Sequence, residues 1–237
     1  SPYVKGEHLF VEPGGAGNSV VCLDKNSGEV VWKAGDDAAA YATPRVLELA
    51  GKPTLVSFNG FGVVGRDPAD GREYWRMRWK TSYDVNSASP QAIGGGRLFV
   101  SSGYGTGCAM YKVGGSGPEE IWKNDNMKNK HTVSVLHDGL LYGFDEDDLV
   151  CLDPDSGERR WKEGGYDKGG LIIAGGKLVI QGENGKLAIG DASAKGFKAD
   201  WEEKVFDEFH CWNHPVLANG RLFAKGVKGN VVAMKVK

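Results

Sequence analysis

The chain has 237 residues, 41% of them hydrophobic, and a formal net charge of −2. It can therefore bury a core, but it has no basic excess for binding nucleic acid. Its four cysteines are separated and form no Cys-x-x-Cys pair, which argues against a disulfide scaffold and a zinc knuckle. No apolar run approaches the ~20 residues that span a bilayer.

Five tryptophans recur about 40 residues apart, a period typical of repeat architectures. They are Trp32, Trp75, Trp122, Trp161 and Trp201. Before Trp32, Trp75 and Trp161 stands the same pattern, an apolar run followed by Asp and then by Ser-Gly or Asp-Gly. Asp accepts backbone N–H groups in tight turns and Gly takes positive φ, so the pattern predicts a hairpin that leads into a Trp-bearing strand.

Taken in chain order, each repeat contains four predicted strands joined by turns. The first begins near a Ser-Pro, Thr-Pro or His-Pro pair, the second follows a Gly-bearing turn, the third ends on the Asp and the fourth carries the Trp. The apolar runs of the second strands are residues 8–11, 55–58, 97–100, 140–144, 177–180 and 221–224. No window shows sustained 3.6-residue periodicity, so we expect helices to be nearly absent.

Four antiparallel strands within about 40–45 residues are typical of a β-propeller blade. We therefore predict an all-β chain forming a single propeller domain over residues 1–237. The predicted four-stranded blades are residues 1–41, 42–86, 87–130, 131–169 and 170–213, and 214–237 form a three-stranded partial blade. Trp32, Trp75 and Trp161 are expected to be largely buried between blades, and Cys22 and Cys151 to be small buried hydrophobic residues.

The Asp-x-x-(Ser/Asp)-Gly-x-x-x-Trp pattern resembles the pyrroloquinoline-quinone (PQQ) propeller repeat. Quinoprotein alcohol dehydrogenases carry this repeat, as do non-enzymatic BamB-like proteins of outer-membrane assembly. The resemblance covers nearly the whole chain and is weaker around Trp122 and Trp201. It implies an exported protein, periplasmic or at the cell surface, whose signal peptide is not in this chain. Because the family propellers usually have eight blades, it also implies a fragment of a larger propeller.

The resemblance leaves two functions open. Family dehydrogenases hold PQQ and calcium on the propeller axis, with a catalytic Asp and a disulfide between adjacent cysteines. This chain has no adjacent cysteines, so no catalytic residue is carried over. The favoured interpretation is a non-catalytic scaffold without a cofactor that binds a protein or small-molecule ligand. The alternative is a PQQ- and calcium-dependent quinoprotein oxidoreductase.

In a propeller, the loops that enter the innermost strands and the loops between second and third strands crowd one face, called the loop face here. Several side chains in these loops break the repeat consensus and combine aromatic rings with hydrogen-bonding groups. The predicted ligand-binding residues are Tyr83, Asp84, Asn86, Tyr104, His131, Trp212 and His214. The alternative is that these loops pack only on one another, with Tyr83 and Trp212 plugging the channel.

Three other patterns favour structural roles. The stretch from Asp145 to Asp148 contains oxygen ligands suited to calcium, but it matches no EF-hand and is interpreted as a solvated hairpin tip. His210 and His214 flank a strand start, not a helix face, so they are a poor metal pair. The glycines of residues 103–107 lack the helix and Lys of a phosphate loop. No metal site is predicted.

Overall fold

The computed structural model describes residues 1–236. Lys237, the last residue of the predicted partial blade, lies outside the described residues. The described chain consists of strands and tight turns, with one short 3₁₀ turn at Ser82–Asp84. Six antiparallel sheets follow one another along the chain, five with four strands and the last with three. The predicted all-β class and blade pattern are thereby confirmed.

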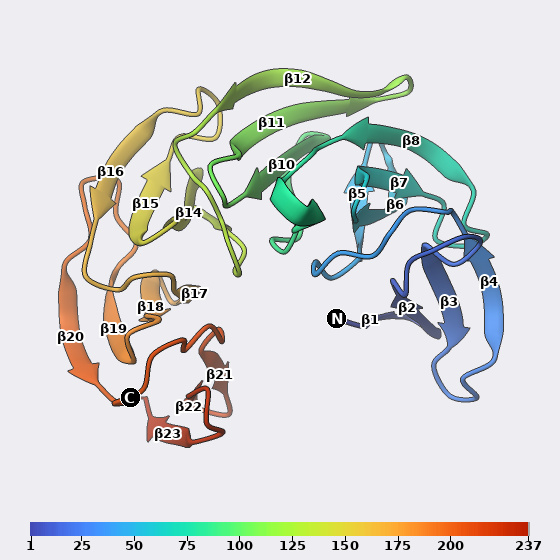
Figure 1. Ribbon diagram of the computed structural model, residues 1–237. Helices are drawn as coiled ribbons and strands as arrows, with labels where there is room; N and C mark the ends of the chain where they lie inside the picture. The colour runs from blue at the N-terminus through green and yellow to red at the C-terminus, as the bar shows by residue number, and fades with distance from the viewer. Residues whose placement is uncertain (237) are drawn as a thin grey trace. The chain divides into compact units, whose positions relative to one another are not determined.

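The chain divides into two compact units, residues 1–123 and the residues from Asn124 onward, which are described separately. The first unit contains the first three sheets, in the orders β1-β2-β3-β4, β5-β6-β7-β8 and β12-β11-β10-β9 (Figure 1). Its strands are β1 (Tyr3–Lys5), β2 (His8–Val11), β3 (Val20–Asp24), β4 (Val30–Ala34), β5 (Arg45–Leu49), β6 (Lys52–Phe58), β7 (Gly62–Arg66), β8 (Glu73–Arg78), β9 (Gln91–Gly94), β10 (Arg97–Ser102), β11 (Gly107–Gly114) and β12 (Gly117–Asn124).

The second unit contains the sheets β13-β14-β15-β16 and β17-β18-β19-β20 and the three-stranded sheet β21-β22-β23. Its strands are β13 (Val135–His137), β14 (Leu140–Asp145), β15 (Asp148–Leu152), β16 (Arg159–Glu163), β17 (Gly170–Ala174), β18 (Lys177–Gln181), β19 (Lys186–Asp191), β20 (Ala199–Lys204), β21 (Val216–Ala218), β22 (Arg221–Lys225) and β23 (Val231–Lys235). The single-domain assignment over the whole chain stays a prediction.

The predicted Asp–Gly turn joins the third and fourth strands of a blade. In the first blade the Asp24 carboxylate accepts the backbone N–H groups of Asn26 and Ser27 at 2.9 and 2.8 Å. Gly28 has φ +75° and donates its N–H to the Asp24 carbonyl at 2.9 Å. The backbone hydrogen bond from Ser27, followed by that from Asn26, lowers the pKa of Asp24. The same turn recurs at Asp67–Gly71 and Asp153–Gly157.

Two of the blade tryptophans form a hydrogen bond to the following blade of their unit. Trp32 donates its indole N–H to the carbonyl of Pro68 at 3.2 Å, and Trp161 donates to the carbonyl of Ser193 at 2.7 Å. Trp75 is buried, with 8% exposure, whereas Trp32 and Trp161 are only partly buried. The prediction of extensive burial is therefore correct for Trp75 and wrong for the other two. All three indoles lie on outermost strands, but only Trp75 belongs to the buried part of a core cluster, the one that joins the second and third blades.

Small residues make room for these indoles. Cys22 and Cys151 lie directly opposite blade tryptophans in the paired strands. Gly65 lies opposite Trp75, and a Cβ at Gly65 would lie 2.3 Å from the indole. All four cysteines are buried and free of disulfides. This confirms that Cys22 and Cys151 serve as small buried hydrophobic residues.

Within each unit the cores lie between consecutive blades. In the first unit, one cluster joins Phe10 and Cys22 to Leu55 of the second blade, and another joins Phe58 and Trp75 of the second blade to the third. In the second unit, one cluster joins the fourth blade to the fifth and another joins the fifth to the sixth. Burying both faces of a sheet against its neighbours is what a propeller blade requires. This packing fixes the ends of the strands, from which the loop-face residues project.

Candidate functional site

In the first unit, two of the predicted ligand-binding residues project into solvent. Tyr83 is 94% exposed, and Asp84 next to it is exposed as well. Both have positive φ, +60° and +54°, within the 3₁₀ turn that precedes β9. Such a conformation is uncommon for residues other than glycine and costs of the order of 1 kcal/mol each. Tyr104, in the turn between β10 and β11, is 43% exposed and has φ +57°.

Asn86 has a different environment from its exposed neighbours. It is fully buried, and its Nδ2 donates to the carbonyl of Asn59 at 2.8 Å. Its Oδ1 accepts the hydroxyl groups of Thr81 and Ser102 at 3.3 and 3.2 Å. The backbone carbonyl of Asn86 accepts the N–H groups of residues 41 and 42. The Asn86 side chain thus fastens the loop before β9 to the second blade.

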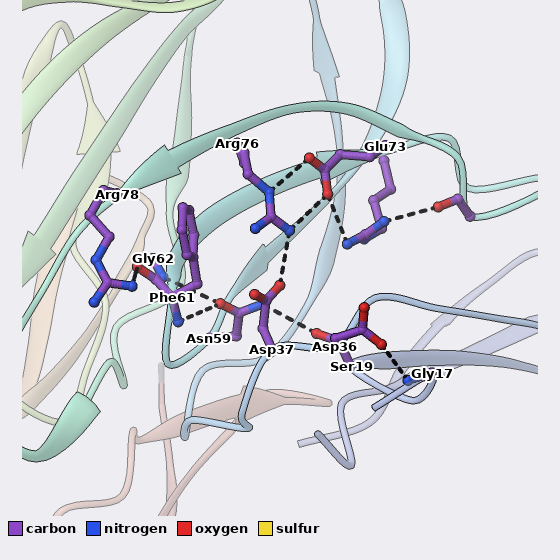
Figure 2. A network of polar contacts seen from close by, with 12 residues as sticks. Gly17, Ser19, Asp36, Asp37, Asn59, Phe61, Gly62, Glu73, Arg76 and Arg78 are labelled. Carbon is purple, nitrogen blue, oxygen red and sulfur yellow. Dashed lines mark hydrogen bonds and ion pairs between the residues drawn. The ribbon is translucent and has the colours of Figure 1, made fainter. Parts of the chain in front are cut away.

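A polar network lies beside this loop, at the junction of the first and second blades (Figure 2). Asn59, buried in the turn between β6 and β7, accepts the N–H groups of Phe61 and Gly62 at 3.0 and 3.3 Å. Its Nδ2 donates to Asp37 at 3.3 Å and to Ser19 at 3.4 Å. One amide side chain therefore closes its own turn and joins two blades.

The same network carries four paired charges. Arg76 forms ion pairs with Asp37 at 3.3 Å and with Glu73 at 2.8 Å. The buried Arg66 pairs with Glu73 at 3.1 Å. The hydrogen bond from Arg76 is the largest cause of a lowered pKa of Glu73, which keeps this carboxylate ionised. The sequence analysis identified none of these four residues, because their role depends on contacts between blades.

In the second unit, the structure brings two predicted residues together. His131 lies in the loop before β13, and Trp212 lies in the loop before β21. Their ring centroids are 4.3 Å apart, and the angle between the ring planes is 31°. His210 extends this group. Its ring centroid lies 4.9 Å from that of Trp212 and 5.2 Å from that of Phe209. We call His131, Phe209, His210 and Trp212 the ring shelf.

A buried carboxylate holds the ring shelf in place. The side chain of Glu183, in the turn between β18 and β19, is only 4% exposed. Its Oε1 accepts the indole N–H of Trp212 at 2.6 Å and lies 2.8 Å from Nδ1 of His210. Its Oε2 lies 3.8 Å from the ammonium group of Lys168, which also pairs with Asp147. Side chains from the loops before β17 and β21 therefore meet at one carboxylate in the turn between β18 and β19.

The ring shelf remains open to solvent although its anchor is buried. Phe209 is 50% exposed and Trp212 is 42% exposed, and the His210 side chain is 58% exposed. Burial lowers the pKa of His131, and the nearby Lys130 lowers it further. The His131 ring is therefore neutral near pH 7, which leaves an apolar and aromatic surface beside polar edges.

His214 lies apart from the ring shelf. Its Nδ1 lies 3.3 Å from the carbonyl of Leu171, and burial lowers its pKa. A Cβ at Gly170 would lie 3.2 Å from this ring nitrogen, so the imidazole packs tightly against β17. His210 and His214 therefore have separate partners.

The hairpin at Asp145 differs from the solvated tip that the sequence predicted. Asp145 is not a solvated tip, because its side chain is only 5% exposed. It pairs with Arg159 at 2.9 Å, with Lys162 at 3.6 Å and with Lys128. Three cations around one carboxylate leave little negative potential for calcium at this turn. In residues 1–236, no group of three or more His, Cys, Asp or Glu side chains is arranged to hold a metal ion.

Glu183 and His210 were not among the seven predicted residues. Asn59, Asp145 and Glu183 all lie at or near the turn between the second and third strands of their blades, and all three are buried. Aligning the repeats at this turn would have singled out Glu183. Its partners, however, lie 27 and 29 residues further along the chain, and their proximity is visible only in the folded unit.

Sheets of four antiparallel strands that pack face to face, with linking tryptophans, define the class of β-propeller proteins. The family model described as "Outer membrane protein assembly factor BamB" matches residues 1–163. The match covers more than half of the chain, and the chain therefore belongs to this family of PQQ-like propellers.

Two curated proteins are similar in sequence. The outer membrane protein assembly factor BamB of Marinobacter adhaerens is 27% identical over 158 residues, which cover 61% of this chain and 38% of that protein. A quinoprotein ethanol dehydrogenase of Pseudomonas aeruginosa is 30% identical over 186 residues, which cover 60% of this chain and 29% of that protein. The matches thus span well under half of the length of either relative.

Solved structures show the same fold. BamB from Moraxella catarrhalis matches with a TM-score of 0.74 at 16% identity, over 99% of this chain and 71% of that chain. Sqt1 of Saccharomyces cerevisiae matches with a TM-score of 0.65 at 14% identity, over 98% of this chain and 69% of that chain. At these identities the likeness concerns the propeller fold alone.

Proposed function

We propose that this chain is a non-catalytic propeller module that binds a protein partner through its loop face. The observation that carries the proposal is the ring shelf, an exposed group of aromatic and imidazole rings held by the buried Glu183. Membership in a family described by outer-membrane protein assembly favours a partner in that process. It also favours an exported protein, located in the periplasm or at the cell surface.

The composition of the ring shelf suits a protein interface. Tryptophan and other aromatic residues are enriched at the energetic centres of interfaces, because they bury a large area at a low cost in side-chain entropy. The hydrogen bond from Trp212 to Glu183 orients the indole before any partner arrives. Preorganisation of this kind lowers the entropic cost of association.

The seven residues predicted from the sequence contribute in different ways to this proposal. His131 and Trp212 belong to the ring shelf, and Tyr83, Asp84 and Tyr104 present exposed groups on the first unit. Asn86 and His214 support the loops, since Asn86 is fully buried and His214 is packed against β17. We therefore propose the first five as contact residues and the last two as positioning residues.

Site-specific photo-crosslinking tests this proposal in cells that produce the full-length protein. Benzoylphenylalanine replaces Phe209, whose ring is half exposed and lies in an edge-to-face arrangement with the ring of His210. We expect irradiation to produce a covalent adduct with an outer-membrane assembly protein, identified by mass spectrometry.

The matched control places the same residue at Lys195, an exposed position in the turn between β19 and β20. The proposal predicts an adduct at position 209 and none at position 195. Equal adducts at both positions, or an absence of protein adducts at position 209, would contradict a protein-binding ring shelf.

The alternative function is a PQQ- and calcium-dependent oxidoreductase, supported by the similarity to quinoprotein ethanol dehydrogenase. Calcium in proteins takes about six to eight oxygen ligands, and the carboxylates of residues 1–236 do not gather into such a group. We therefore assign no catalytic step. Titration of the purified chain with PQQ and calcium, followed by absorbance, tests the alternative; saturable binding would favour it.

A further inference from the structure

The first unit presents a second group of interest, formed by the partly buried ring of Phe61 and the exposed guanidinium groups of Arg76 and Arg78. Phe61 follows Asn59 in the turn between β6 and β7, and both arginines belong to β8. The guanidinium carbon lies 4.4 Å from the Phe61 ring centroid for Arg76 and 5.0 Å for Arg78. Figure 2 shows the phenyl ring between the two arginine side chains.

The arginines in this part of the first unit differ in whether a carboxylate pairs with them. Arg66 and Arg76 are balanced by Asp37 and Glu73 within the network described above. Arg78 is exposed, and no carboxylate of residues 1–236 lies within ion-pairing distance of it. One positive charge therefore remains uncompensated at this position.

Arg78 is nevertheless held in a defined orientation. Its Nη1 donates to the backbone carbonyl of Phe61 at 3.1 Å, and its guanidinium lies against the phenyl ring. The Phe61 N–H is in turn bound by the buried Asn59 side chain. A guanidinium has five N–H donors, so a single carbonyl partner leaves most of the donor edge available.

We infer that Arg78 and Phe61 form a docking point for a carboxylate side chain of a protein partner. A guanidinium edge matches the two oxygens of a carboxylate in a bidentate arrangement, and the phenyl face excludes water from one side of the pair. Preorganisation by the Phe61 carbonyl and ring reduces the entropy lost on binding. The inference deepens the proposed function, because it assigns acidic chemistry to the segment of the partner that contacts the first unit.

The experiment follows the side-chain Nε–H signals of the arginines by nuclear magnetic resonance in the isotope-labelled full chain. The probe is a peptide of consecutive glutamates flanked by glycines, and the matched control peptide has glutamine in place of glutamate. The Arg78 signal is assigned by its absence from the Arg78→Lys variant. We expect a saturable shift of the Arg78 signal with the glutamate peptide only.

Variants separate a specific docking point from general attraction between charges. Arg78→Gln is expected to weaken peptide binding at least about fivefold, since a charge-assisted bidentate pair is lost. Arg78→Lys, which keeps the charge without the planar edge, is expected to fall between the wild type and Arg78→Gln. Arg72→Gln removes an exposed arginine from the turn at the other end of β8 and is expected to leave binding unchanged.

Three outcomes would overturn the inference: an absent Arg78 shift, an equal shift with the glutamine peptide, or equal losses in Arg78→Gln and Arg72→Gln. Melting temperatures of the variants check that each one is folded. The result is independent of the adduct at position 209. A failed peptide titration with a positive adduct refutes the acidic docking point alone, and the reverse refutes the role of the ring shelf.

Discussion

The turn between second and third strands has different roles in the second and fifth blades. In the second blade the turn carries Asn59, whose amide bonds the backbone of its own turn and the loop of the first blade. In the fifth blade it carries Glu183, whose carboxylate binds Trp212 and His210. Both residues are buried, at 1% and 3% exposure of the whole residue. The same position therefore closes loops in one blade and presents rings to solvent in the other.

The chemistry of the two side chains explains this difference. An amide both donates and accepts, so Asn59 can satisfy backbone N–H groups and carboxylate or hydroxyl oxygens together. An ionised carboxylate only accepts, so Glu183 requires donors from other side chains, here an indole, an imidazole and an ammonium group. In the fifth blade two of these donors are large side chains of the next loop, whereas the carboxylate of Asp145 in the fourth blade meets Arg and Lys side chains. A repeated fold can thus acquire a distinct surface through one substitution in its turn.

Among substitutions that compare the two turns, Asn59→Ala is expected to cause the largest loss of stability. The substitution leaves the N–H groups of Phe61 and Gly62 without an acceptor in a buried setting. A free energy of unfolding lower by about 2–4 kcal/mol is expected from the loss of several buried hydrogen bonds. Urea titration measures the loss. Asn26→Ala, which removes an exposed amide, is the control and is expected to change stability by less than about 0.5 kcal/mol.

Glu183→Ala is expected to lower the free energy of unfolding by less, about 1–3 kcal/mol. The indole and imidazole groups that lose their carboxylate partner are already partly exposed to solvent. The same titration applies, with Glu203→Ala on β20 as an exposed carboxylate control. A loss that exceeds that of Asn59→Ala would show that the ring shelf is a structural plug and would remove the contrast between the two turns.

The two units are also expected to respond to pH in opposite directions. Burial raises the pKa of Glu12, in the first unit, from 4.5 to about 7. The stability contributed by its protonated form is present below pH 4.5 and is lost as the pH rises through about 7. Burial lowers the pKa of His131 and His214, in the second unit, from 6.5. Their contribution is present above pH 6.5 and is lost as the pH falls through their lowered pKa values.

Denaturant titrations between pH 5 and pH 8 check these signs by comparing wild type with single variants. Relative to wild type, Glu12→Gln is expected to gain stability as the pH rises, and His131→Phe is expected to gain stability as the pH falls. A Glu12→Gln difference that stays flat over this range would show that the carboxyl group is ionised in the folded chain, contrary to its burial.

The smallest effect is expected for Tyr83→Ala on the loop face of the first unit. Because Tyr83 is 94% exposed, the loss of its ring is expected to change stability by less than about 0.5 kcal/mol. Thermal unfolding measures this change. A decrease of several degrees in the melting temperature would indicate that the ring packs on another part of the protein.

The blades were predictable from the sequence because their determinants are local. Asp24, Ser27 and Gly28 lie within one turn, and their hydrogen bonds depend on no other part of the chain. The spacing of the tryptophans then follows from the length of a blade. Burial of Trp161 was overestimated, because the fraction of its ring that a neighbour covers depends on the shape of the next blade.

The candidate site was predictable only in part. His131 and Trp212 stood out because they break the repeat pattern in loops that a propeller brings together, and their ring centroids lie 4.3 Å apart. Asn86 has the same polar character as a ligand-binding residue, yet it is buried against Asn59 and Ser102. A polar residue in a loop can bind a ligand or close the loop, and only its burial distinguishes these roles. Glu183 was missed because a carboxylate in a turn is ordinarily solvated.

The most direct test of the central claim is the yield of protein adduct at position 209 in two backgrounds, Glu183→Ala and Glu203→Ala. If the buried carboxylate positions the ring shelf for a partner, the yield is expected to fall about tenfold in Glu183→Ala, as expected for the loss of a central interface contact. The yield is expected to stay at the parental level in Glu203→Ala. An undiminished yield in a folded Glu183→Ala protein, or equal losses in both backgrounds, would contradict the account.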